Sequence, residues 1–260
     1  MGTMVSTLVF QPPPTTFLHN KKHFWLQTRN QNRIPVFHVE RSSQFTVLFS
    51  HGNAEADLGL IYEWFYDFSR QLNVNVLAYE YAGYGKSEGT QSEDNCYADI
   101  RAAYDYLTVQ KGILPRQIIL YGRSLGSGPT CHLAEELSSQ KVALGGVILQ
   151  SPLASAFRVA FNFRFTMPGD LFPNIDRMAN IQCPVFIIHG TRQDWEDEVV
   201  PFWHGQELFF ATPTKWRAKP FWVDGAGHNN IEVLLREDGT LFDRMTDFLN
   251  EWCRNDFRGD

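Results

Sequence analysis

The feature that most constrains this chain is an apolar run that ends in a glycine-flanked serine. Residues 118–121 are Ile-Ile-Leu-Tyr, the next five are Gly-Arg-Ser-Leu-Gly, and a helical pattern runs from Pro129 to Leu137. This order predicts a strand, a sharp turn with Ser124 at its apex, and a helix. A β-carbon at Gly122 or Gly126 would collide with the strand or helix beside the turn, which holds the serine in a strained backbone conformation. Because Gly-x-Ser-x-Gly also occurs by chance, the rest of the chain decides whether the serine is a nucleophile.

Strand and helix patterns alternate along the rest of the chain. Two short strands, His23–Thr28 and Ile34–Glu40, predict an antiparallel hairpin near the start. Continuous apolar runs follow, of which Phe45–Ser50 is the first, and such runs are typical of parallel strands buried on both faces. We predict further strands at 74–79, 142–150, 185–189 and 220–223, and helices at 58–72, 95–109, 201–211 and 231–253, the last broken near Asp238-Gly239. A short strand is also predicted near Thr7–Phe10.

The predicted order indicates an α/β fold with a mostly parallel sheet, an antiparallel N-terminal hairpin and helices on both faces. A chain of 260 residues can form one such domain. We expect residues 1–20 to be an extended N-terminal segment and residues 21–260 to be a single domain.

Composition narrows the classes of function. The net charge is −6 without a block of like charges, which does not match the basic footprint of nucleic-acid-binding proteins. The four cysteines are widely spaced, so we expect a reducing compartment, the cytoplasm. No apolar run approaches the length of a membrane span. Residues 1–6 fit the pattern for myristoylation of Gly2, a match that chance explains equally well. We expect contact with membranes to be peripheral at most.

Polar groups follow several of the predicted parallel strands, and the carboxyl ends of such strands share one edge of the sheet. Ser124 is the first of these groups. The turn His51-Gly52-Asn53-Ala54 lets a backbone N–H point at the space above that serine. Together with the N–H of Leu125 it would form an oxyanion hole, with Asn53 as the expected donor and Ala54 as the second choice. A plain loop with a capping asparagine is the alternative.

An acidic loop follows the strand at 185–189. A carboxylate there can hold an imidazole in the correct tautomer and stabilise its cation. The candidates are Asp194, Glu196, Asp197 and Glu198. Asp197 comes just before Glu-Val-Val-Pro, where the next helix is predicted to start, and is therefore favoured over Asp194. The two glutamates suit a solvated helix N-terminus.

His228 lies on a glycine-rich turn after the last predicted strand, and the order serine, acid, histidine is the one that this architecture uses. His51 and His189 are interpreted as strand-end residues that bond to loop backbone. No His/Cys/Asp cluster has the spacing of metal ligands, so we expect no metal and no cofactor. The residues therefore predict acyl transfer by Ser124 and His228 through an acyl-enzyme.

Five motifs together resemble the alpha/beta hydrolase domain-containing protein 17 family. They are Ser-His-Gly-Asn-Ala at 50–54, Tyr-Ala-Gly-Tyr-Gly-Lys-Ser at 81–87, Tyr-Gly-Arg-Ser-Leu-Gly-Ser-Gly-Pro at 121–129, Ser-Pro-Leu-Ala-Ser at 151–155 and Gly-Ala-Gly-His-Asn-Asn at 225–230. The resemblance covers roughly residues 20–250. It implies an α/β-hydrolase fold with a small lid, and a serine hydrolase that removes palmitate from cysteine thioesters of membrane-associated proteins. It also implies that Ser124 is the nucleophile, Asp197 the acid and His228 the base.

The chain departs from that family in three places. Residues 192–195 (Arg-Gln-Asp-Trp) intervene where relatives run almost directly from His-Gly-Thr to Glu-Asp-Glu-Val, so Asp194 remains an alternative acid. Animal members of the family have an acylated, cysteine-rich N-terminus, and no cysteine precedes Cys96 here. Glu80 stands where an aspartate is usual, a change for which the residues alone suggest no reason.

The phenylalanine-rich segment at about 155–182 lies where hydrolases of this family carry a lid. We expect a groove for an acyl chain beneath it, with Phe161, Phe165 and Phe172 binding substrate. Packing of these rings onto the core is an equally compatible interpretation. The expected partner is an acylated protein or a lipid-like ester, and the expected state is a monomer. Alternatives are a carboxylesterase or lipase, a peptidase of the same fold, or a non-catalytic scaffold.

Overall fold

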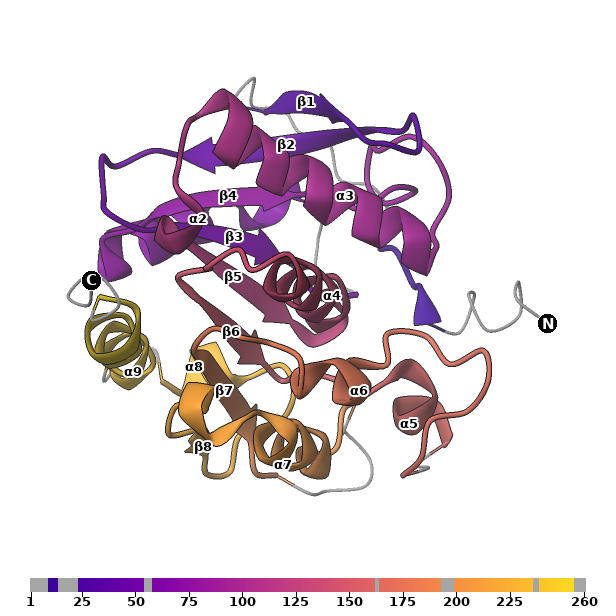
Figure 1. Ribbon diagram of the computed structural model, residues 1–260, viewed down its shortest axis with the longest axis vertical. Coiled ribbons are helices and arrows are strands. Elements are labelled where there is room, and N and C mark those ends of the chain that lie inside the picture. Colours follow the sequence, from indigo (N-terminus) through magenta and orange to yellow (C-terminus); the bar gives the residue numbers. More distant parts are fainter. Residues whose placement is uncertain are drawn as a thin grey trace.

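The computed structural model describes residues 9–13, 23–53, 58–161, 164–192, 199–235 and 239–254. Within these residues, eight strands form one twisted sheet in the order β1-β2-β4-β3-β5-β6-β7-β8 (Figure 1). The strands are β1 (Phe24–Gln27), β2 (Arg33–Val39), β3 (Thr46–Ser50), β4 (Asn75–Tyr79), β5 (Ile118–Arg123), β6 (Gly146–Gln150), β7 (Val185–Gly190) and β8 (Phe221–Val223). β1 and β2 pair in antiparallel fashion, as do β2 and β4, and all other neighbours are parallel. The predicted sheet, with its antiparallel N-terminal pair, is confirmed.

Helices cover both faces of the sheet, as predicted (Figure 1). They are α2 (Leu58–Leu72), α3 (Glu93–Asp105), α4 (Ser127–Ser139), α5 (Ala156–Phe161), α6 (Asn174–Met178), α7 (Phe202–Ala211), α8 (Ile231–Leu234) and α9 (Thr240–Phe248). Residues of α3, α4, α6 and α7 pack in one core cluster, and residues of α2, α8 and α9 pack in a second cluster on the other face.

The apolar run of β3 shows why the sheet is buried on both faces. Leu48 belongs to one core cluster, whereas its neighbours Val47 and Phe49 belong to the other. Successive side chains of a strand point to opposite faces, so a strand between two helical layers must be apolar at every position. Phe49 also stacks on Tyr121 of β5, with ring centroids 4.7 Å apart.

Four segments differ in detail from the predictions. The strand predicted at 142–150 begins only at Gly146, because residues 142–145 are not part of the sheet. The predicted helix at 95–109 starts earlier, with Ser92 as its N-cap, and its end is the π-helical turn Tyr106–Gln110. The predicted helix at 231–253 is divided into α8 and α9, and Gly239 caps α9 in the left-handed region at φ 71°. The strand predicted near Thr7–Phe10 lies largely outside the described residues, and Val9 and Phe10 are not part of a strand.

Burial shifts the pKa of several titratable groups inside this fold. Removal from water disfavours a charged imidazole and lowers the pKa of His189 to about 4 and that of His204 to about 3. The same cause lowers the pKa of His38, His132 and His228. Burial raises the pKa of Asp99 to about 8, although the Ala82 N–H, 2.8 Å from Asp99 Oδ2, favours the ionised form.

We therefore expect the free energy of unfolding to be greatest near pH 6.5. Below this pH the unfolded chain binds protons at the five histidines more readily than the folded chain does, so each of them favours unfolding as the pH falls. Asp99 acts in the opposite sense, because between the ordinary aspartate pKa of about 4 and its raised pKa of about 8 the folded state keeps a proton that the unfolded state has lost. Its stabilisation therefore decreases as the pH rises toward 8.

Urea unfolding at about pH 5, 6.5 and 8 measures this balance. Asp99→Asn should remove the loss of stability between pH 6.5 and 8 and leave the loss below pH 6.5 in place. Equal stability at pH 5 and 6.5 in the unmutated chain would contradict the assignment of neutral buried histidines.

Candidate active site

Ser124 stands at the apex of a tight turn between β5 and α4. Its φ is 51°, in the left-handed region where a residue other than glycine costs about 1–3 kcal/mol. A β-carbon on Gly126 would lie 2.1 Å from the carbonyl oxygen of Ser50, and one on Gly122 would lie 2.7 Å from the carbonyl oxygen of Gly126. The predicted need for glycine on both sides of the serine is confirmed.

His228 lies on the loop after β8 and meets Ser124 across the edge of the sheet. Its Nε2 is 2.9 Å from Ser124 Oγ, although 104 positions separate the two residues in the chain. The imidazole is 6% exposed. This burial, with the nearby His189 and Arg123, lowers the pKa of His228 to about 3, so the ring is neutral at neutral pH. A neutral ring whose Nε2 accepts from the serine hydroxyl carries its proton on Nδ1.

The Nδ1 of His228 is buried and has no hydrogen-bond partner among the described residues. Buried polar groups in native proteins are nearly always paired, so this atom calls for an acceptor. The four acidic candidates Asp194, Glu196, Asp197 and Glu198 lie outside the described residues. The backbone on one side of them is anchored to the histidine loop, because Arg192 N–H donates to the Ala226 carbonyl at 3.0 Å. On the other side, Val199 and Val200 line the same cavity as Ser124.

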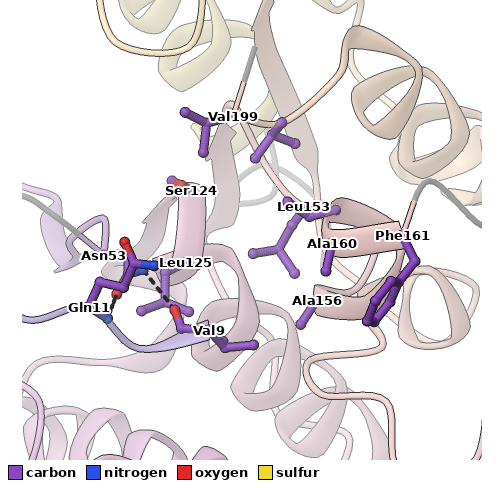
Figure 2. Close-up of a pocket in the computed structure, with 12 residues that line it drawn as sticks. Val9, Gln11, Asn53, Ser124, Leu125, Leu153, Ala156, Ala160, Phe161 and Val199 are labelled. Atoms are coloured by element: carbon purple, nitrogen blue, oxygen red, sulfur yellow. Dashed lines mark hydrogen bonds between the residues drawn. The ribbon is translucent and has the colours of Figure 1, made fainter. Parts of the chain in front are cut away.

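Asn53 and Leu125, the expected oxyanion-hole residues, both line the cavity beside Ser124 (Figure 2). Leu125 is on the first turn after the serine, and Asn53 is on the loop after β3. Ala54, the second choice, lies outside the described residues. The assignment of the two backbone N–H groups to an oxyanion stays a prediction.

A buried contact between a histidine and a glutamate positions the loop that carries Asn53. His51 Nε2 is 2.7 Å from Glu80 Oε1, and its Nδ1 is 2.8 Å from the Gly52 carbonyl oxygen, which confirms that His51 bonds to loop backbone. Tyr81 also donates its hydroxyl to the His51 carbonyl at 2.7 Å. Glu80, which the sequence left unexplained, therefore contacts the strand end next to the candidate oxyanion hole. Its departure from the family pattern was the only signal of this role in the sequence.

Above Ser124 lies a cavity of about 460 Å³ with largely apolar walls. The wall opposite the serine is formed by Leu153 and by residues of α5, of which Figure 2 shows Ala156, Ala160 and Phe161. The near wall includes Val9 and Gln11, which sequence reasoning missed because they lie far from every motif. A half-buried serine that is paired with a buried histidine and lines such a cavity can deliver a nucleophile to an acyl group.

Of the three phenylalanines expected to bind substrate, one lines the cavity. Phe161 is part of its wall and 52% exposed. Phe165 is 60% exposed and does not belong to the wall. Phe172 is fully buried, with its ring against Gly128 and edge-on to Phe10, so the expectation for this residue is corrected to a core role. A β-carbon on Gly128 would lie 2.2 Å from that ring.

Among the described residues, no group of three or more His, Cys, Asp or Glu side chains could hold a metal ion. None of the helices in the described part of the chain is both long and apolar enough to cross a membrane.

Comparison with known proteins places these features in context. A family model described as alpha/beta hydrolase fold matches residues 46–221. The chain is 43% identical to human alpha/beta hydrolase domain-containing protein 17C over 235 residues, which is 89% of this chain and 67% of that protein. It is 41% identical to human protein 17B over 231 residues, covering 88% of this chain and 75% of the relative.

Solved structures show the same fold at low sequence identity. The Pyrococcus furiosus esterase Pf2001 superposes with a TM-score of 0.71 at 20% identity, over 94% of this chain and 100% of that one. Est1E from Butyrivibrio proteoclasticus, solved with ferulic acid bound, gives a TM-score of 0.62 at 17% identity, over 86% and 98% of the two chains.

Proposed function

This chain belongs to the alpha/beta hydrolase domain-containing protein 17 family, and from that premise we propose that it is a serine hydrolase of acyl thioesters or esters, with S-palmitoylated proteins as its substrates. The observation that carries the proposal is the 2.9 Å contact between Ser124 Oγ and His228 Nε2 at an apolar cavity of about 460 Å³. Cavities of this size with mostly apolar walls and a few polar groups are typical small-molecule binding sites.

The proposed reaction proceeds in two halves. His228 Nε2 takes the proton of Ser124, and the serine oxygen forms a bond to the carbonyl carbon of the substrate. The N–H groups of Leu125 and Asn53 stabilise the negative oxygen of the tetrahedral intermediate, and Asp197 stabilises the imidazolium. His228 then gives its proton to the departing sulfur or oxygen. Water, deprotonated by the same histidine, attacks the acyl-serine and releases the fatty acid.

The apolar walls lead to a prediction about chain length. Toward p-nitrophenyl esters from acetate to palmitate, kcat/KM should rise with the acyl chain until the cavity is filled. Each buried methylene contributes up to about 0.8 kcal/mol, which is roughly fourfold in kcat/KM. Steady-state kinetics with Ser124→Ala as the blank measures this. Activity that falls steadily from two carbons upward would identify a small-ester esterase instead.

Two further substrates separate the remaining alternatives. An S-palmitoyl peptide and its oxygen-ester analogue distinguish a thioesterase from a lipase or carboxylesterase, because only the leaving atom differs. A peptidase would cleave an amide of the same peptide. Absence of turnover with all of them, in a chain that is folded by circular dichroism, would favour the non-catalytic scaffold.

A further inference from the structure

The N-terminal strap, residues 9–13, lies beside Ser124 although it is more than a hundred positions away in sequence (Figure 2). The side-chain amide of Asn53 forms two hydrogen bonds with the backbone of the strap. Asn53 Nδ2 donates to the Val9 carbonyl at 2.7 Å, and Gln11 N–H donates to Asn53 Oδ1 at 2.9 Å. One amide group thus pairs with a C=O and an N–H two residues apart, as a neighbouring strand would.

The middle residue of the strap is an apolar anchor. Phe10 is buried between the two bonded residues, and its ring packs edge-on against Phe172 with centroids 5.9 Å apart. Phe172 in turn packs against Gly128 on the first turn of α4, the helix that follows the serine turn. The strap is therefore fixed both to the loop after β3 and to the core beneath the serine turn.

The same strap supplies one wall of the cavity. Val9 and Gln11 face Ala156, Ala160 and Phe161 of α5 across it. Val9 is half-buried and packs against the core, whereas Gln11 is exposed, and both residues line the cavity. Any acyl chain that extends from Ser124 between these two walls must contact the strap.

We propose that the N-terminal strap is a specificity-determining wall of the acyl-binding site, in which Val9 and Gln11 limit the chain that fits and the Asn53 side chain keeps the wall in place. This inference rests on the proposed function, since it assigns a role within the same site. Tyr84 supports the Asn53 side chain, because its hydroxyl also donates to Asn53 Oδ1. The Asn53 side chain is thus a positioning group, distinct from the backbone N–H expected to contact the oxyanion.

The experiment compares kcat/KM for a long and a short p-nitrophenyl ester in full-length variants. Val9→Trp fills the cavity from the strap side and should lower the long-to-short ratio by roughly tenfold or more, as misfitting groups in apolar pockets do. Gln11→Trp does the same from an exposed position, where the substitution cannot unfold the core. Val109→Trp is the matched control, because Val109 is 78% exposed and does not line the cavity. It should leave the ratio unchanged.

The role of the Asn53 side chain in holding the strap is tested separately. Asn53→Asp replaces the Nδ2 donor by an oxygen that repels the Val9 carbonyl, so the strap should detach and discrimination between the two esters should fall. A strap that only stabilises the fold would instead lower the melting temperature of these variants and leave the ratio at the wild-type value. An unchanged ratio of long-ester to short-ester kcat/KM in these variants, together with turnover by the wild-type chain, would overturn the strap inference and leave the proposed function standing. Absence of turnover and of fluorophosphonate labelling in the wild-type chain would overturn the proposed function and the strap inference with it.

Discussion

Alanine in place of Ser124 is expected to reduce acyl-ester hydrolysis by about six orders of magnitude, the loss typical of a serine–histidine nucleophile. The hydroxyl of Ser124 is the group within 2.9 Å of His228 Nε2 at the cavity, so its removal leaves the imidazole with nothing to activate. Covalent labelling by a fluorophosphonate should disappear in the same variant, because the label requires an activated oxygen. Kinetics and gel-based labelling measure the two effects.

Loss of either Ser124 or His228 should abolish activity to the same extent. His228→Ala and the double variant should each be about as inactive as Ser124→Ala, because residues that act as one unit do not contribute additively. Ser139→Ala is the matched control. It removes an exposed hydroxyl at the far end of α4, where Ser139 Oγ donates only to the Glu136 carbonyl at 2.7 Å. Full labelling of Ser124→Ala, or a further large loss in the double variant, would move the nucleophile elsewhere.

Asn in place of Asp197 is expected to lower kcat by about four orders of magnitude, whereas Asp194→Asn should have little effect. The physical reason is the buried Nδ1 of His228, which has no acceptor among the described residues. A carboxylate accepts its proton and fixes the tautomer in which Nε2 faces Ser124, and an amide that donates there would select the wrong tautomer, at a cost of about 10⁴ in known triads.

The pair of substitutions is its own control, since both remove one charge from the same acidic loop. Equal melting temperatures would show that each variant is folded, and kcat at saturating ester gives the effect on chemistry. A large loss in Asp194→Asn with full activity in Asp197→Asn would transfer the role to Asp194, as the four additional residues of this loop allow.

The sequence predicted the sheet well because burial on both faces requires uninterrupted apolar runs. Runs such as Phe45–Ser50 and Val185–His189 coincide with β3 and β7 to within one residue. The meeting of Ser124 and His228 was also predictable, because parallel strands end at one edge of the sheet and functional sites of such sheets form at that edge. The fold class followed from the order of elements alone.

Side chains in irregular segments could not be placed in this way. Phe161 and Phe172 belong to the same phenylalanine-rich stretch, and one lines the cavity while the other is in the core. The choice depends on Gly128 and Phe10, which make room for Phe172 from elsewhere in the chain. Likewise, nothing in the local pattern of Val9 and Gln11 indicates that Asn53 binds them. Such contacts arise from tertiary packing, which periodicity does not encode.

His228 is attached to the rim of the sheet and not to its centre. The strand before it, β8, has three residues and pairs only with β7 within the described part of the chain, whereas Ser124 follows β5 in the middle of the sheet. Edge elements of this kind open by local unfolding at a lower free energy than the centre, as amide hydrogen exchange commonly reveals. Under mild denaturant the molecule would therefore lose turnover while its helices and central strands persist. An enzymatic assay would then report whether the β8 edge of the sheet is intact, and circular dichroism would report the remaining secondary structure.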